Sequence, residues 1–73
     1  MINDESVAKQ ISDLMLEYGA RLDASVALVR GRCTEDEFRA YRSAVGEVMG
    51  AMLLEIMNPL YARHPALKPD GLR

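Results

Sequence analysis

Cys33 and His64 are the two side chains best suited to nucleophilic chemistry, and each is the only residue of its type in the chain. A nucleophile needs a base within hydrogen-bonding reach, and that base is usually histidine. Some 30 residues of helix would separate the two by about 45 Å, although an antiparallel dimer could bring them together across chains. One cysteine and one histidine also cannot form the usual zinc site within one chain. We therefore predict no catalytic residues and no zinc site.

Glu47 and Glu55 are the carboxylates that are hardest to assign to simple solvation, because both border a wide apolar arc. A carboxylate in such a position can bind a metal in a four-helix bundle, but those sites also use a Glu-x-x-His motif. The chain has no such motif. We expect both residues to lie on a solvated or salt-bridged rim, and we predict no metal, no cofactor and no enzymatic activity.

Four arginines gather around one point of the chain: Arg30, Arg32, Arg39 and Arg42. Arginines on a helical hairpin can contact phosphate groups. The acidic residues 35–37 lie in the same region and offset the positive charge, and the formal net charge of the chain is −2. Nucleic acid is therefore an unfavoured partner, and a nucleic-acid-binding regulator that uses these arginines is the alternative hypothesis.

The length of 73 residues indicates a single domain, residues 1–73. A chain this short buries only about 60% of the surface that its unfolded form exposes. Small domains usually add disulfides, a metal or a partner. Because the single Cys33 excludes an intrachain disulfide, self-association is the expected source of further stability. The lone cysteine also fits a reducing compartment, and we interpret it as a small buried apolar residue rather than a reactive thiol.

The first helix is predicted over residues 4–30. Asp4 and Glu5 fit its first turn, where negative charge interacts favourably with the helix dipole. Apolar residues then recur at spacings of three and four, which indicates an amphipathic helix: Val7, Ile11, Leu14, Tyr18, Leu22, Val26 and Val29. A thinner apolar strip lies on the opposite side: Leu16, Ala20, Ala24 and Ala27. Gly31 fits the left-handed position that ends many helices.

The second helix is predicted over residues 35–57. The sequence Thr34-Glu35-Asp36-Glu37 matches a capping box, in which the threonine side chain and Glu37 satisfy each other's backbone N–H groups. Cys33 and Phe38 occupy the positions of a hydrophobic staple. A connection of about three residues makes the two helices antiparallel neighbours.

The second helix carries an apolar arc of about half its circumference, wider than the roughly 100° stripe that one partner helix covers. It also contains Gly46 and Gly50, each of which costs a helix about 1 kcal/mol relative to alanine. Close approach of another helix would explain these two glycines. That helix could be the first helix, through its alanine strip, or the second helix of another chain, through the same glycine face. We predict this interface with a second copy or another protein: Val45, Gly46, Met49, Gly50, Met52, Leu53, Ile56 and Met57.

The apolar run of residues 43–62 is long enough to span a membrane. Glu47 and Glu55 lie inside it, and acidic residues there are costly, so we predict no membrane span.

Asn58-Pro59 predicts a break in the helix followed by a short helical turn through Ala62. Residues 65–73 are expected to form an extended tail. The polar, acidic N-terminal sequence MINDESVAKQ does not resemble a secretory signal, so the cytoplasm is the expected location.

The run MLLEIMNPLYARHPALKP, with the preceding EFRAYRSAVGEVMG, resembles a segment of small uncharacterised bacterial proteins of helical-hairpin type. This resemblance covers about half of the chain; it implies a bacterial source and no particular activity. MNPLY is similar to the end of nucleoid-modulating proteins of the Hha type, but the long first helix departs from their pattern. The outline of a short-looped hairpin is similar to that of Rop-type RNA-binding dimers, and a shared fold alone does not transfer function.

These observations predict an all-α protein: an antiparallel helical hairpin with a short C-terminal helical turn, two copies of which dimerise into a four-helix bundle. The main functional hypothesis is a non-enzymatic homodimeric interaction module that acts as a small adaptor or regulator. A further protein partner is compatible with this hypothesis.

Overall fold

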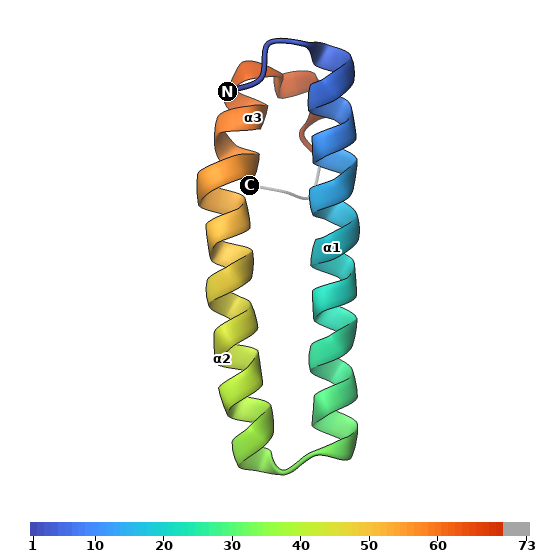
Figure 1. Ribbon diagram of the computed structural model, residues 1–73, viewed down its shortest axis with the longest axis vertical. Helices are drawn as coiled ribbons and strands as arrows, with labels where there is room; N and C mark the ends of the chain where they lie inside the picture. Colours follow the sequence, from blue (N-terminus) through green and yellow to red (C-terminus); the bar gives the residue numbers. More distant parts are fainter. Residues whose placement is uncertain (70–73) are drawn as a thin grey trace.

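The computed structural model of the chain describes residues 1–69, and it is an antiparallel helical hairpin with a short C-terminal turn (Figure 1). The described residues contain only helices and their connections, so the predicted all-α hairpin is confirmed. In chain order the elements are α1 (Glu5–Arg32), α2 (Glu35–Ala51), the π-helical turn η1 (Met52–Met57), α3 (Asn58–Arg63) and the 3₁₀ turn η2 (Pro65–Leu67).

Helix α1 begins as predicted but ends later than predicted. The Asp4 carboxylate accepts a hydrogen bond from the Val7 N–H at 3.1 Å and so caps the first turn. The expected left-handed stop at Gly31 is wrong, because no described residue has a positive φ and the helix runs on to Arg32. The Cys33 N–H still donates to the Val29 carbonyl at 2.9 Å. Cys33 then turns extended, so the helix ends without a glycine.

The connection between α1 and α2 consists of Cys33 and Thr34, both extended. The capping box is confirmed: the Glu37 N–H donates to Thr34 Oγ1 at 3.2 Å, and the Thr34 N–H donates to Glu37 Oε1 at 2.9 Å. The prediction that Cys33 is buried is wrong, because the thiol lies exposed at the tip of the hairpin. At that tip only two helix ends are present to cover it.

The predicted break at Asn58-Pro59 is also wrong, because the helical path continues from α2 through η1 into α3. Within η1 the Asn58 N–H donates to the Leu53 carbonyl, five residues back, and Asn58 keeps helical dihedrals (φ −61°, ψ −48°). In an α-helix the proline ring would clash with the carbonyl four residues before it. The wider π turn gives that ring room, so the helix passes Pro59 and ends at Arg63.

The main buried cluster lies at the end of the hairpin where the N-terminal residues, α1 and α3 meet (Figure 1). Ala8, Met57, Leu60 and Tyr61 form it, and Leu67 of η2 packs against it. Residues 65–67 are therefore a packed 3₁₀ turn rather than the predicted extended tail, and the tail residues 70–73 lie outside the described part of the chain. Toward the tip, α2 buries only Phe38 and Val45.

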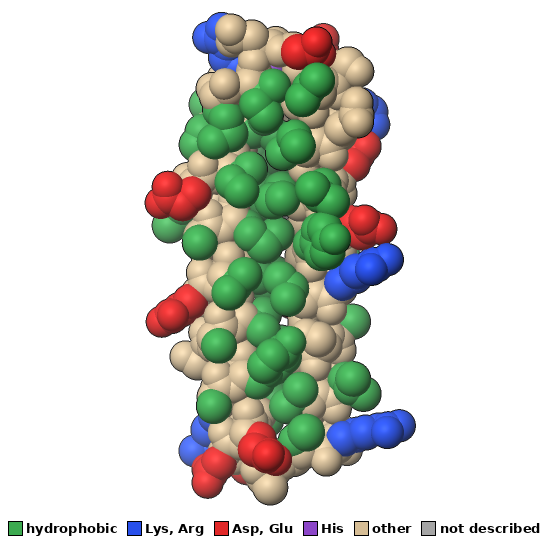
Figure 2. Space-filling model, viewed as in Figure 1, with side chains coloured by type: hydrophobic (Ala, Val, Ile, Leu, Met, Phe, Trp, Pro, Cys, Tyr) green, Lys and Arg blue, Asp and Glu red, His purple; other side chains and the backbone are tan. Residues whose placement is uncertain are grey.

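Two helices leave much of their apolar surface uncovered. Of the stripe predicted to bury one face of α1, Val7, Leu14 and Tyr18 remain exposed. The space-filling view shows apolar side chains along the seam between the two long helices, with acidic and basic side chains at its edges (Figure 2). The contact between the two helices of one hairpin therefore covers only part of their apolar surface.

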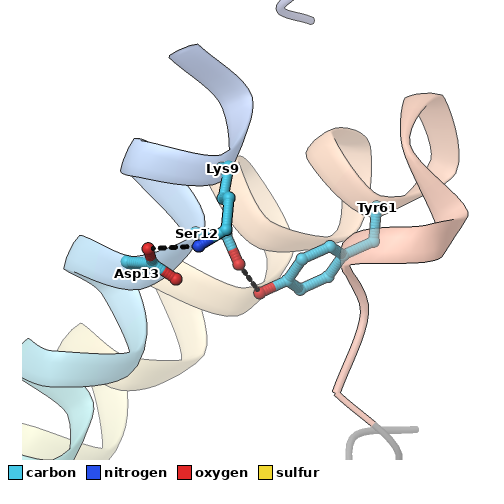
Figure 3. A network of polar contacts seen from close by, with 4 residues as sticks. All are labelled: Lys9, Ser12, Asp13 and Tyr61. Atoms are coloured by element: carbon cyan, nitrogen blue, oxygen red, sulfur yellow. Dashed lines mark hydrogen bonds and ion pairs between the residues drawn. The ribbon is translucent and has the colours of Figure 1, made fainter. Parts of the chain in front are cut away.

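Two serine–tyrosine hydrogen bonds join α1 to the rest of the chain. Ser12, which is 2% exposed, shares a hydrogen bond of 2.7 Å with the Tyr61 hydroxyl of α3 (Figure 3). Asp13, the residue after Ser12, forms an exposed ion pair at 3.0 Å with Lys9, one turn earlier in α1. Nearer the tip, the Tyr41 hydroxyl lies 2.7 Å from Ser25 Oγ, which donates to the Leu22 carbonyl. These bonds fix the register of α1 against its neighbours.

Removing one hydroxyl of the buried pair is expected to destabilise the fold. In Tyr61→Phe the buried Ser12 hydroxyl loses its partner, which costs about 1–3 kcal/mol of unfolding free energy. In Tyr41→Phe the Ser25 hydroxyl keeps its bond to the backbone, so the loss should be smaller. Urea denaturation followed by circular dichroism measures both. Equal losses in the two variants would contradict the buried role of the Ser12–Tyr61 bond.

The capping box also predicts a small dependence of stability on pH. Hydrogen bonds from the backbone and side chain of Thr34 lower the pKa of Glu37 below its ordinary value of 4.5. Because the folded pKa is the lower one, the carboxylate contributes stability above the unfolded pKa and loses it as pH falls through the folded pKa. Urea midpoints measured across this acid range should drop less in Glu37→Gln than in Glu17→Gln, which removes a carboxylate far from the cap.

Candidate functional site: an apolar groove along the hairpin

An apolar groove of about 480 Å³ runs along one flank of the hairpin. Its walls come from α1 on one side and from α2 and η1 on the other. The lining residues are Met15, Leu16, Gly19, Ala20, Asp23, Met49, Gly50, Met52, Leu53 and Met57. Asp23 is the only charged residue among them, so the groove offers a surface for apolar contact with a polar group at one end.

The structure brings together five of the eight residues predicted as an interface. Met49, Gly50, Met52, Leu53 and Met57 line the groove. Of the other three, Val45 is buried inside the hairpin, Ile56 is half-buried and Gly46 is exposed, and none of them lines it.

The opposite wall of the groove lies outside the residues predicted as an interface. It comes from α1 and includes Leu16 and Ala20, two residues of the thin apolar strip noted in the sequence. That strip was the available signal. The larger apolar stripe of the same helix includes Val7, Leu14 and Tyr18, which the structure leaves exposed.

Gly50 leaves open space on the α2 side of the groove, and Gly46 does so outside the groove. A Cβ atom added at Gly46 or Gly50 would meet no atom of residues 1–69 within 4 Å, whereas one at Gly19 would lie 3.9 Å from the Met49 side chain. Close packing of the alanine strip of α1 against the glycine face of its own α2 is therefore ruled out within one chain. The second alternative, contact with another chain, stays a prediction.

A second, smaller hollow of about 340 Å³ adjoins the groove toward the hairpin tip, and the two share Asp23. Its walls also include Arg30, Phe38 and Arg42. The Arg30 guanidinium lies over the Phe38 ring at 5.1 Å from its centre, a cation–π contact that holds the side chain in place. No ion pair among residues 1–69 includes Asp23, Arg30 or Arg42.

The structure thus divides the four predicted phosphate-contacting arginines. Arg30 and Arg42 line the same hollow, while Arg32 does not. Arg39 instead lies 3.4 Å from the Glu35 carboxylate in an exposed ion pair. Two positive side chains, with Asp23 between them and the groove, make a small mixed-charge surface rather than a continuous basic one.

The residues considered for catalysis are far apart or solvent-exposed. Cys33 lies at the hairpin tip, whereas His64 Nε2 lies 2.6 Å from the Ile2 carbonyl at the other end of the molecule (Figure 1). Glu47 and Glu55 are exposed, as predicted for a rim. Within residues 1–69 no three acidic, histidine or cysteine side chains come close enough to hold a metal ion.

Comparisons with known proteins add no assignment to this geometry. The chain matches no protein-family model, no curated protein and no solved structure. In the described part of the chain, none of the helices combines the length and the hydropathy that a membrane crossing requires. The proposed function therefore rests on the groove and the adjoining hollow.

Because no atom of the described residues lies within 4 Å of the Cβ positions of Gly31 and Gly50, alanine there should stabilise the dissociated protein. Each substitution is expected to raise the unfolding free energy by up to about 1 kcal/mol through helix propensity. Thermal melts at low protein concentration, followed by circular dichroism, measure this. A loss of stability in Gly50→Ala alone would contradict the open space beside that residue.

Proposed function

We propose that this chain is a non-enzymatic interaction module that works as a homodimer. In this proposal two hairpins bury their apolar grooves against each other and complete a four-helix bundle. The observation that carries the proposal is the groove itself, because its walls are apolar while nothing in the described chain covers it. Burial of such surface is the dominant favourable term in most protein association.

The surface area of the chain supports a partner. Its accessible surface is 5364 Å², whereas folded monomers of 8.1 kDa expose about 4500 Å². The elongated shape, 44 × 19 × 16 Å, contributes to the difference of roughly 900 Å². That difference is close to the roughly 800 Å² that each partner buries in a standard interface. Side-by-side association of two rods would remove surface along their long dimension.

The nucleic-acid alternative has less support. Only Arg30 and Arg42 share a hollow, and Asp23 lies beside them. Nonspecific nucleic-acid binding depends on several phosphate contacts and weakens steeply with salt. Retention of RNA or DNA that falls as salt rises would favour the alternative over the interaction module.

The proposal is tested by the mass of the protein in solution. Sedimentation equilibrium and light scattering over a wide concentration range should give a dimer that dissociates on dilution. Circular dichroism on the same samples should show helicity falling as the dimer dissociates. A chain that stays monomeric at high concentration, with its helicity unchanged, would contradict the proposal.

Gly50→Leu tests the groove directly. The leucine side chain would fill space that the partner needs, so the dimer should weaken by about tenfold or more, since overpacking typically costs 1–3 kcal/mol. Gly31→Leu is the matched control, because Gly31 also has open space around it but lies at the hairpin tip. Equal dimer strength in the two variants would mean that the interface lies elsewhere.

A further inference from the structure

The positions of the charged residues in the groove and the adjoining hollow restrict how two copies can be oriented. This inference rests on the proposed homodimer. Asp23 of α1 and Arg42 of α2 line the same hollow, so they lie at the same height along the hairpin. Neither is in an ion pair among the described residues. Nearer the middle of the groove, Gly19 of α1 lies beside Met49 of α2, since a Cβ atom added at Gly19 would lie 3.9 Å from the Met49 side chain.

Two arrangements give a two-fold dimer with antiparallel neighbours throughout. In one, the axis runs along the bundle, so α1 of each hairpin packs on the partner's α2 and both tips lie at the same end. In the other, the axis is perpendicular to the helices, so each helix packs on its own copy and the tips lie at opposite ends. Both satisfy the requirement that a two-fold interface be complementary to itself.

The axis along the bundle makes each level of one copy meet the same level of the other. Asp23 then faces a second Arg42, and the reciprocal pair forms on the other side of the axis. Leu16 and Ala20 face a second Gly50, so that a large side chain on one copy meets open space on the other. Opposite charges facing each other across an interface fix its register and exclude wrong pairings.

The perpendicular axis, centred on the groove near Gly19, brings different levels together. Asp23 lies four residues from Gly19, so it would face the level of Met15 and Leu16 on the second copy. A carboxylate placed against apolar side chains loses water without gaining a partner, which is unfavourable. Arg42 lies seven residues from Met49, the α2 residue beside Gly19, so it would face the level of Ile56 on the second copy rather than Asp23.

We infer that the two hairpins associate with their tips at the same end. In this dimer Asp23 of each copy pairs with Arg42 of the other, and Leu16 packs over Gly50. The groove is therefore covered by a second copy of this chain in a defined orientation, with α1 of each copy packed on α2 of the other.

The native cysteine allows a direct measurement of that orientation. Cys33 is the only cysteine, is exposed and lies at the tip. A nitroxide spin label on Cys33, with distances measured by pulsed electron paramagnetic resonance, should give a separation below about 30 Å, because neighbouring helices lie about 8–10 Å apart. Opposite tips would be separated by about 42 Å, since Cys33 lies fourteen residues from the groove centre at Gly19.

Each outcome of this measurement has a distinct meaning. A labelled dimer with the short distance supports the inferred orientation. A dimer with a distance above about 40 Å overturns it and leaves the proposed homodimer intact. A labelled protein that sediments as a monomer at high concentration overturns both.

Charge reversal gives an independent test by mixing two variants. In Asp23→Arg and in Arg42→Glu, each homodimer would face like charges and should dissociate about tenfold or more readily than the native dimer. Mixed together, they restore opposite charges at one pair of positions and keep the native pair at the other. Native mass spectrometry should then show mainly heterodimer. A statistical mixture of the three dimers would overturn the assigned contact between Asp23 and Arg42.

Discussion

Two antiparallel helices can bury side chains only along the one seam where they contact each other. This limit determines which apolar residues of the chain are buried and which stay exposed. A side chain outside that seam has no third element to cover it, so large apolar residues such as Leu28 and Leu54 remain more than half exposed. The exception is the end where α3 and the N-terminal residues add a further layer, and the main buried cluster forms there. The rest of the hairpin has an apolar groove on one flank, which a second hairpin would cover in the proposed four-helix bundle.

The layered end depends on the helix passing Pro59. If the chain had turned away at Asn58, Leu60 and Tyr61 would have left the path that brings them against α1. The π turn keeps them on it: Leu60 is fully buried, and the Tyr61 hydroxyl reaches Ser12. The bond from His64 Nε2 to the Ile2 carbonyl closes the same end over the first residues of the chain. A local irregularity in η1 thus allows the tertiary contacts that define the core.

The features that could be predicted from the sequence are those set by a few adjacent residues. The capping box at Thr34 needs only Thr34 and Glu37, and the short connection it creates determines the antiparallel hairpin. The course of the helix at Pro59 could not be predicted in the same way, because tertiary packing around Leu60 and Tyr61 favours a π turn over a break. The serine–tyrosine bonds depend on the register between distant segments, which the sequence pattern leaves open. The α2 wall of the groove lies among the residues predicted as an interface, whereas on the α1 wall the sequence indicated only a thin apolar strip that includes Leu16 and Ala20.

Gly46 and Gly50 connect this packing argument to association. Each lowers the helix propensity of α2 by about 1 kcal/mol relative to alanine, and among residues 1–69 no atom takes the space that each leaves. Close approach of a helix from this part of the chain therefore does not offset that cost. In the proposed dimer the offset comes from the partner helix, which can approach the backbone closely and cover the groove. The middle of α2 would then be the least stable part of the free chain and a well-packed part of the assembly, so that helix stability and self-association rise and fall together.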